Sequence, residues 1–270
     1  MALGLAMVPE CAKAGKILDF SFNGSGTEEA SGRGASDTLK LMLLDSRKME
    51  VDLHSEDGGG VSGKPGDKAL NLTSAEGMGA VVDGPEVKGP VAKGERQTDA
   101  LSSMVSYTVQ GWFKTDGDPI RGVARLIDCT MDGVSAPLLA IWSTVSPGTI
   151  YFTVSNPEVD SGSKAPASKY SAFKQQNEWV FFAITYSQDN GAIHFYTGGS
   201  ERSVSSINSV VAHAKTSDIS CTPYIGNTRG FNRPFKGFID NLRIFGSKTD
   251  DSGALSIEAL EELRTKDIGG

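Results

Sequence analysis

One acidic side chain interrupts an apolar, strand-like segment near the end of the chain. Residues 238–245 alternate, so Phe238, Asp240, Leu242 and Ile244 are expected on one face of a strand. A buried carboxylate without a partner is too costly to keep ionised. The spacing therefore predicts that Asp240 either accepts hydrogen bonds from backbone amides or binds a cation such as Ca2+, whose ligands are oxygens.

Other positions are of the types that bind sugars, where an exposed aromatic ring combines with amides or carboxylates. Trp142 stands between apolar and polar residues and is predicted at an exposed strand edge, whereas Trp179 is expected in the core. Trp112 is predicted on the face away from the core, either packed under a loop or stacked on a ligand. A polar group in the loop before the last strand either binds hydroxyls and carboxylates or forms a solvated turn: Asn227, Arg229, Asn232 and Arg233.

Residue types that often act in catalysis form no recognisable motif. The histidines, His54, His194 and His213, are far apart, and no nucleophile elbow, phosphate-binding loop or His-Glu-x-x-His motif is present. The cysteines at 11, 129 and 221 lack Cys-x-x-Cys spacing, which argues against a zinc site. Cys129 and Cys221 either form a disulfide or remain two free thiols, and the sequence leaves both alternatives open.

Charge and composition narrow the classes of partner. The 270 residues include 26 basic and 33 acidic side chains, and the formal net charge of −7 argues against a nucleic-acid partner. No run of eighteen apolar residues predicts a membrane span. Residues 1–14 end in Ala12-Lys13-Ala14, which indicates a signal remnant or an apolar leader, and residues 15–270 are predicted to form one domain.

Glycine and proline divide the sequence into many short strand-like segments, which excludes a helical bundle. Asn190-Gly191 predicts a tight hairpin turn, and Ser256 with Glu258 predicts a short helix to about Arg264. Residues 78–100 are expected to be irregular with at most a short edge strand. The predicted strands are 17–22, 69–72, 107–114, 125–129, 138–142, 149–154, 179–186, 192–196, 223–225 and 235–245.

In this order the segments resemble the LamG-like jelly-roll domains of the concanavalin A-like lectin/glucanase superfamily. The resemblance implies an all-β antiparallel sandwich of two sheets, each with six or seven strands, and a short C-terminal helix. The matching segments are Ile17-Leu-Asp-Phe-Ser-Phe-Asn-Gly24, Ala69-Leu-Asn-Leu72, Tyr107-Thr-Val-Gln-Gly-Trp-Phe113, Trp179-Val-Phe-Phe-Ala-Ile-Thr-Tyr186, Phe195-Tyr-Thr-Gly-Gly199, Tyr224-Ile-Gly-Asn227, Phe235-Lys-Gly-Phe-Ile-Asp-Asn-Leu-Arg-Ile244 and Leu255-Ser-Ile-Glu-Ala-Leu260.

The function that the resemblance implies is broader, because this superfamily holds lectins, adhesion modules, glycosidases and lyases on one scaffold. The Glu-x-Asp-x-x-Glu run of its laminarinase-type glycosidases is absent, and Glu158-Val-Asp160 in a polar loop is the nearest approach. We therefore expect a secreted or cell-surface recognition module for carbohydrate or an extracellular protein. The alternatives are a structural component of a surface assembly and a glycoside hydrolase or lyase; lyase candidates are Tyr151, His194, Tyr196, Arg125 and Lys114.

The resemblance also implies a structural calcium ion. Many members hold one between the first strand, a following loop and an aspartate of the last strand. At the matching positions this implies Asp240 as a side-chain ligand, with Asp19 or Asn23 and a carbonyl near Gly77 as companions.

Overall fold

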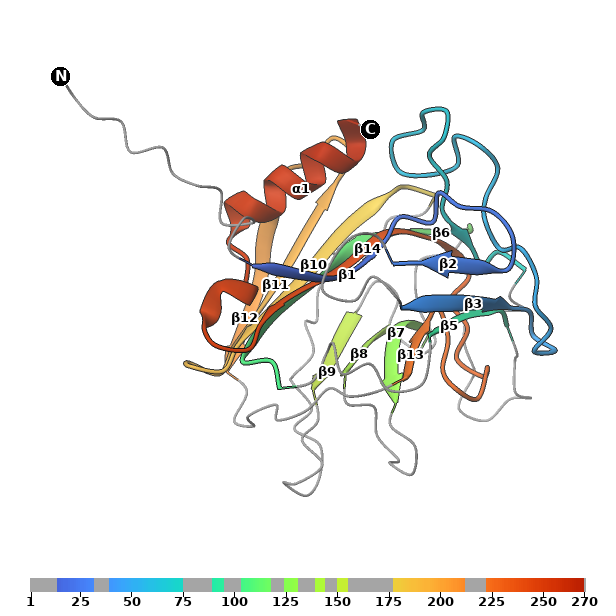
Figure 1. Cartoon of the computed structure of the whole chain (residues 1–270). Helices are drawn as coiled ribbons and strands as arrows, with labels where there is room; N and C mark the ends of the chain where they lie inside the picture. Colours follow the sequence, from blue (N-terminus) through green and yellow to red (C-terminus); the bar gives the residue numbers. More distant parts are fainter. Residues whose placement is uncertain are drawn as a thin grey trace.

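The protein is a sandwich of two antiparallel β-sheets, as Figure 1 shows. The computed structural model describes residues 14–31, 39–74, 89–94, 103–117, 124–130, 139–143, 150–154, 177–211 and 222–269. Within these residues each sheet has 7 strands. The predicted all-β sandwich with a C-terminal helix is therefore confirmed, and so is the strand number that the resemblance implied.

The first sheet contains the longest strands and carries the helix. Its order is β1 (Gly15–Phe20), β14 (Gly237–Ser247), β6 (Ser106–Thr115), β10 (Val180–Ser187), β11 (Ala192–Gly199) and β12 (Ser205–Val211), and β4 (Leu70–Asn71) also pairs with β14. The hairpin between β10 and β11 confirms the predicted turn. Gly191 has a φ of 64°, and the Asn190 side chain accepts the Ala192 amide at 2.8 Å.

The second sheet includes strands that sequence patterns did not predict. Its order is β2 (Glu28–Ala30), β3 (Lys40–Leu44), β5 (Val91–Gly94), β13 (Thr222–Ile225), β7 (Arg125–Thr130), β8 (Leu139–Ser143) and β9 (Ile150–Val154). The expectation of at most an edge strand in residues 78–100 is wrong, because β5 pairs with β3 and β13. A strand of 4 residues is too short to show alternation and is defined by its neighbours.

The central strands are apolar on both faces because both faces are covered. In β10, Phe182 and Ile184 belong to the core between the sheets, whereas Phe181 and Ala183 face outward. The helix α1 (Ile257–Gly269), which follows the 3-10 turn η4 (Asp251–Gly253), covers this outer surface (Figure 1). Among the described residues, no helix combines the length and apolar character needed to cross a membrane.

The helix begins as predicted and continues further. The Ser256 hydroxyl accepts the Ala259 amide at 3.4 Å, in the manner of an N-cap. The helix extends past the predicted end at Arg264 to Gly269. Its last turns are fixed by contacts with the sheet, since Asp267 is buried and hydrogen-bonded to Trp112. Capping residues and helix propensity are local signals, so they could not predict these contacts between distant parts of the chain.

A bulge in β14 changes which side chains face outward. Asn241 has a φ of 46°, and the pairing of β14 with β6 shifts register between Asp240 and Arg243. Leu242 and Ile244 belong to the inner core, whereas Asp240 lies on the outer side under Val61. The predicted shared face of Asp240, Leu242 and Ile244 is therefore wrong, because one extra residue reverses the alternation.

Cys129 is buried in β7 and is in a disulfide bond. This excludes the alternative of a free thiol at Cys129. Cys11 and Cys221 lie outside the described residues. The pairing of Cys129 with Cys221 therefore stays a prediction.

We predict that Gly237→Ala destabilises the fold by about 2–3 kcal/mol. Gly237 has a φ of 151°, and an added Cβ would lie 2.1 Å from the Lys114 carbonyl oxygen. Urea unfolding measures the loss. Gly63→Ala is the matched control, because Gly63 also has a positive φ, 67°, but no neighbour within 4 Å. Gly63→Ala should lower the free energy of unfolding by about 1 kcal/mol. Equal costs would contradict the steric explanation.

Candidate functional site

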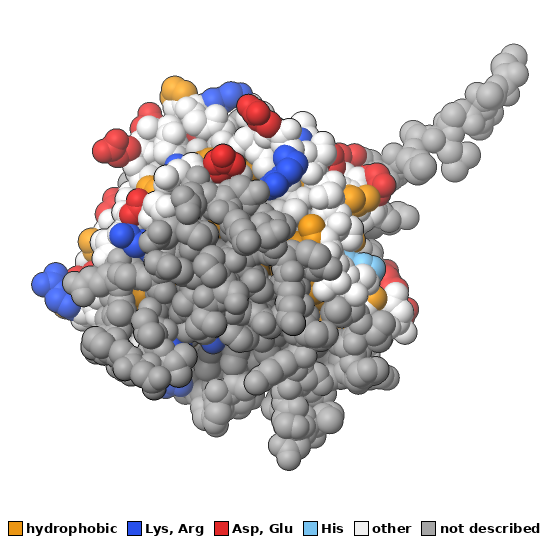
Figure 2. Space-filling view, turned by 180° about the vertical axis from the view of Figure 1, so that it is seen from behind, with side chains coloured by type: hydrophobic (Ala, Val, Ile, Leu, Met, Phe, Trp, Pro, Cys, Tyr) orange, Lys and Arg blue, Asp and Glu red, His pale blue; other side chains and the backbone are white. Residues whose placement is uncertain are grey.

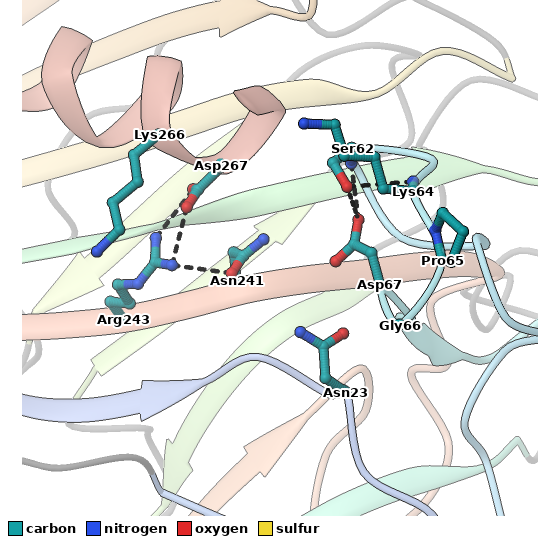
Figure 3. A pocket seen from close by; sticks show the side chains of 10 residues that line it. All are labelled: Asn23, Ser62, Lys64, Pro65, Gly66, Asp67, Asn241, Arg243, Lys266 and Asp267. Carbon is teal, nitrogen blue, oxygen red and sulfur yellow. Dashed lines mark hydrogen bonds and ion pairs between the residues drawn. The ribbon is translucent and has the colours of Figure 1, made fainter. Parts of the chain in front are cut away.

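A polar pocket lies where α1, β14 and the loop after residue 60 meet, and Figure 3 shows its side chains. Its volume is about 550 Å³. Lys266 and Asp267 enter from the helix, Asn241 and Arg243 from β14, and Asn23 from the segment after β1. The remaining lining residues are Ser62, Lys64, Pro65, Gly66 and Asp67. We call this the polar pocket.

Arg243 is the most constrained side chain of the polar pocket. Its Nε donates to Asp19 at 2.9 Å, and its Nη1 and Nη2 lie 2.9 and 2.8 Å from the two carboxylate oxygens of Asp267. Asp267 also accepts the Trp112 indole N–H at 2.9 Å. Burial alone would lower the pKa of Arg243, but the carboxylates of Asp267 and Asp19 outweigh it, so this pKa is raised. Arg243 therefore joins β1, β14 and α1 as a fixed cation.

Other groups of the polar pocket remain available to a ligand. The Asn241 Oδ1 accepts from Arg243 at 2.8 Å, so its amide nitrogen points away from Arg243 (Figure 3). One Asp67 oxygen accepts from the Ser62 amide at 2.7 Å and from its hydroxyl at 2.8 Å. The exposed Lys266 amino group has no ion pair among the described residues. The pocket thus presents donors and acceptors side by side.

Asp240 lies outside the pocket lining and is fully buried beside it. Its carboxylate accepts the Val61 amide at 2.8 Å and the Asn241 amide at 2.6 Å. Burial raises the pKa of Asp240 well above its usual value despite the Val61 amide, and the Asp67 and Asp267 carboxylates raise it further. These bonds match the predicted alternative in which Asp240 accepts backbone amides.

The other residues of the predicted calcium site also have protein partners. Asp19 forms ion pairs with Lys16 and Arg243, and the Asn23 Oδ1 accepts the Lys68 amide at 2.6 Å. Gly77 lies outside the described residues. Across the described part of the chain, no group of three or more His, Cys, Asp or Glu could hold a metal ion. Because Ca2+ also binds carbonyl and amide oxygens, the calcium site stays a prediction, and we derive no function from this ion.

Two predicted ligand-binding residues are structural. Trp112 lies on the outer sheet face, as expected, but it is 0% exposed beneath α1. Asn227 is also 0% exposed; its amide nitrogen donates to the Gly89 carbonyl, and its oxygen accepts the Thr228 and Arg233 amides. The burial of Trp112 therefore matches the predicted alternative of packing rather than ligand stacking, although a helix covers it, and Asn227 is buried rather than part of a solvated turn. The sequence could not show that a helix and a loop bury them.

The remaining predicted ligand residues do not join the polar pocket. Arg229 is exposed, and Asn232 accepts the Thr228 hydroxyl at 2.9 Å within the loop before β14. Arg233 is partly buried, and its carbonyl accepts the Arg125 amide. Trp142 lies in β8 opposite Arg125 and Tyr151, but its side chain lies outside the described part. Its role in ligand binding stays a prediction.

The catalytic candidates are dispersed over the two sheets. Arg125 pairs with Asp128 at 3.0 Å in the second sheet, whereas His194 and Tyr196 lie on β11 in the first, with ring centroids 6.3 Å apart. Lys114 lies over the Trp179 ring at 5.0 Å. Glu158, Asp160 and the Tyr151 side chain lie outside the described residues. The described candidates therefore form no common site.

The position of His54 between two carboxylates was not predicted from the sequence. The two ring nitrogens of His54 lie 2.7 Å from Asp52 and 3.1 Å from Glu29, and the side chain is 2% exposed. Glu29 also accepts the Phe22 amide at 2.9 Å. Because the carboxylates occupy opposite sides of the ring, this group ties the loop after β3 to β2 rather than forming a reactive centre. No motif signals it, since its members come from separate segments.

Comparisons with known proteins support the fold. Residues 93–252 match the family model described as the concanavalin A-like lectin/glucanases superfamily. The Ruminococcus gnavus IT-sialidase CBM40 bound to α2,3-sialyllactose is 15% identical and has a TM-score of 0.42, with 60% of this chain and 83% of that chain covered. No curated protein has a detectable sequence match.

Two larger structures cover nearly the whole chain. The binding domain of botulinum neurotoxin serotype D is 14% identical with a TM-score of 0.53, and 93% of this chain and 52% of that chain are covered. A Trypanosoma rangeli sialidase is 12% identical and has a TM-score of 0.53, and 94% of this chain and 33% of that chain are covered. This chain therefore spans about half of the first and a third of the second, and both similarities show the fold alone.

We predict that Asp267→Ala destabilises the protein by about 3–5 kcal/mol. The change leaves Arg243 with one carboxylate, Asp19, and removes the acceptor of the buried Trp112 N–H. Urea unfolding measures the effect. Glu262→Ala on the exposed side of the same helix is the control and should change stability by less than about 0.5 kcal/mol. Similar losses for both variants would contradict a central role for the Arg243 ion pairs.

We predict that Asp240→Asn gains stability relative to the native chain as the pH rises. The folded pKa of Asp240 is raised, so its stabilising contribution is present below the ordinary carboxyl pKa and is lost as pH rises through the folded pKa. Urea unfolding of both proteins from about pH 4 to about pH 8 measures the difference. A difference that does not change with pH would contradict the raised pKa.

Proposed function

The chain belongs to the concanavalin A-like lectin/glucanases superfamily, and on that premise we propose that it is a non-catalytic recognition module that binds carbohydrate. We place the ligand in the polar pocket. The observation that carries this proposal is the mixed lining, in which the amides of Asn23 and Asn241 lie beside the charges of Asp67 and Lys266 (Figure 3).

This lining suits sugar hydroxyls, because each hydroxyl both donates and accepts a hydrogen bond. The lysines of the pocket and the Asn241 amide nitrogen are donors, and Asp67 is an acceptor. A volume of about 550 Å³ lies in the range typical of small-ligand sites. The ion pairs of Arg243 hold the floor of the pocket in place, which reduces the entropy lost on binding.

The described residues favour binding over hydrolysis. A glycosidase of the common type needs two carboxyl groups on either side of the scissile bond. In the polar pocket both oxygens of Asp267 face Arg243, and the nearby Asp240 is fully buried. Among the described residues of the pocket, Asp67 therefore has no free carboxylate partner. A polysaccharide-acting enzyme is the alternative, and its test is the release of new reducing ends.

We further propose that the module acts outside the cell, in secreted or surface-bound form. The disulfide of Cys129 supports this, because such bonds persist in oxidising compartments. Figure 2 shows basic and acidic side chains interspersed over the described part of one face, which fits a neutral or weakly charged partner better than a polyanion. An extracellular protein is the second candidate partner.

We predict that the native chain is retained on a glycan array and that Lys266→Ala with Asn23→Ala weakens this retention about tenfold. The two changes remove exposed donors of the polar pocket without touching the Arg243 ion pairs. Glu262→Ala is the control. Trp142→Ala tests the remaining predicted contact in parallel. No retention of any glycan by the native chain would refute the proposed function.

The calcium ion stays a prediction with its own test. If Ca2+ binds Asp240, chelation should lower the melting temperature of the native chain but not that of Asp240→Asn. Equal melting of the native chain with and without chelator would exclude the ion.

A further inference from the structure

A second pocket of about 520 Å³ lies at another edge of the first sheet. It forms between the residues just before β10 and the turn that joins β11 to β12. Asn177, Glu178 and Trp179 line it from one side, and Glu201 and Arg202 from the other. We call it the Trp179 pocket. It shares no lining residue with the polar pocket.

Trp179 is the aromatic residue of this pocket, and it contacts Lys114 and Phe238. The Lys114 amino group lies 5.0 Å from the centre of its ring, and Phe238 meets it in an edge contact at 6.5 Å. The same lysine lies 4.7 Å from the Phe238 ring. Trp179 packs against the outer hydrophobic cluster but remains partly exposed, so the expectation that it is a core residue is confirmed only in part. These contacts fix the orientation of the Trp179 ring, and part of the ring surface remains open to a ligand.

The polar groups of the Trp179 pocket are mainly acceptors. Glu178 and Glu201 are exposed, and neither has an ion pair or a hydrogen-bond partner among the described residues. The Asn177 Oδ1 accepts the Gly117 amide at 3.0 Å, so its amide nitrogen remains as a donor. Arg202 donates to the Gly198 carbonyl at 3.0 Å within the turn. Two carboxylates without a partner among the described residues therefore line the same pocket as one aromatic ring.

The turn that carries Glu201 is rigid. Gly199 and Arg202 exchange backbone hydrogen bonds of 2.8 and 3.3 Å. Arg264 of α1 donates to the carbonyls of Gly199 and Ser200 at 2.7 and 3.2 Å. The same helix contributes Lys266 to the polar pocket. The last turns of α1 thus contact the Trp179 pocket on one side and line the polar pocket on the other.

We infer that the Trp179 pocket is a separate subsite for a neutral pyranose ring. The C–H face of the sugar lies on Trp179, and its hydroxyl protons are accepted by Glu178 and Glu201. The carboxylates of Glu178 and Glu201 favour a neutral sugar over an acidic one at their positions, and the guanidinium of Arg202 donates within the turn. The polar pocket carries Lys64 and Lys266 instead. This inference rests on the proposed function and assigns different parts of a glycan to the two pockets.

The test is NMR titration of the indole N–H resonances with neutral oligosaccharides of glucose, galactose and mannose. We expect the Trp179 resonance to shift, whereas that of Trp112, which is buried and bonded to Asp267, stays in place. Glu178→Gln combined with Glu201→Gln should weaken the affinity about tenfold. Trp179→Ala should weaken the affinity for neutral oligosaccharides more than the double glutamine variant does, and Glu262→Gln should leave it unchanged. The double glutamine variant keeps the test valid if Trp179→Ala fails to fold.

The outcomes separate this inference from the proposed function. Neutral sugars that bind without shifting Trp179, or that bind the double glutamine variant equally well, would overturn the subsite and leave carbohydrate binding intact. Retention of acidic glycans alone would also overturn it. If the native chain binds no glycan at all, the proposed function fails together with the subsite.

Discussion

The arrangement of this protein depends on one buried cation, Arg243, held between two carboxylates. Asp19 reaches it from β1 and Asp267 from α1, at distances of 2.8 to 2.9 Å. A buried charge is costly, and removing one partner leaves the others without compensation. The network therefore orients three elements with little freedom. It fixes the helix over Trp112 and builds the floor of the polar pocket.

The bulge at Asn241 makes this network possible. A regular strand would place Arg243 on the side opposite to Asp240, whereas the register shift places both outside the inner core. Asn241, whose φ is positive, also lines the polar pocket, so the backbone irregularity and the candidate site coincide. Asp240 then lies beneath the loop of Val61, where two amides offset part of its desolvation.

The two pockets use the same scaffold in different ways. The polar pocket draws charged groups from a helix, a strand and a loop, whereas the Trp179 pocket presents one aromatic ring and two carboxylates at the ends of strands. Both are held by rigid elements, as a recognition site requires. The fold by itself does not specify a ligand, so these side chains determine what each pocket can bind.

The sandwich, most of its strands and the terminal helix could be predicted from the sequence, because alternation, turn residues and caps are local signals. The sequence also identified Asp240 as a residue that needs a partner. The remaining features depend on how the elements pack together. The burial of Trp112 and Asn227, the partial exposure of Trp179 and the outward turn of Asp240 depend on a helix, loops and a bulge that meet over long distances in the chain. Side-chain exposure is a property of the packed molecule, and no local pattern encodes it.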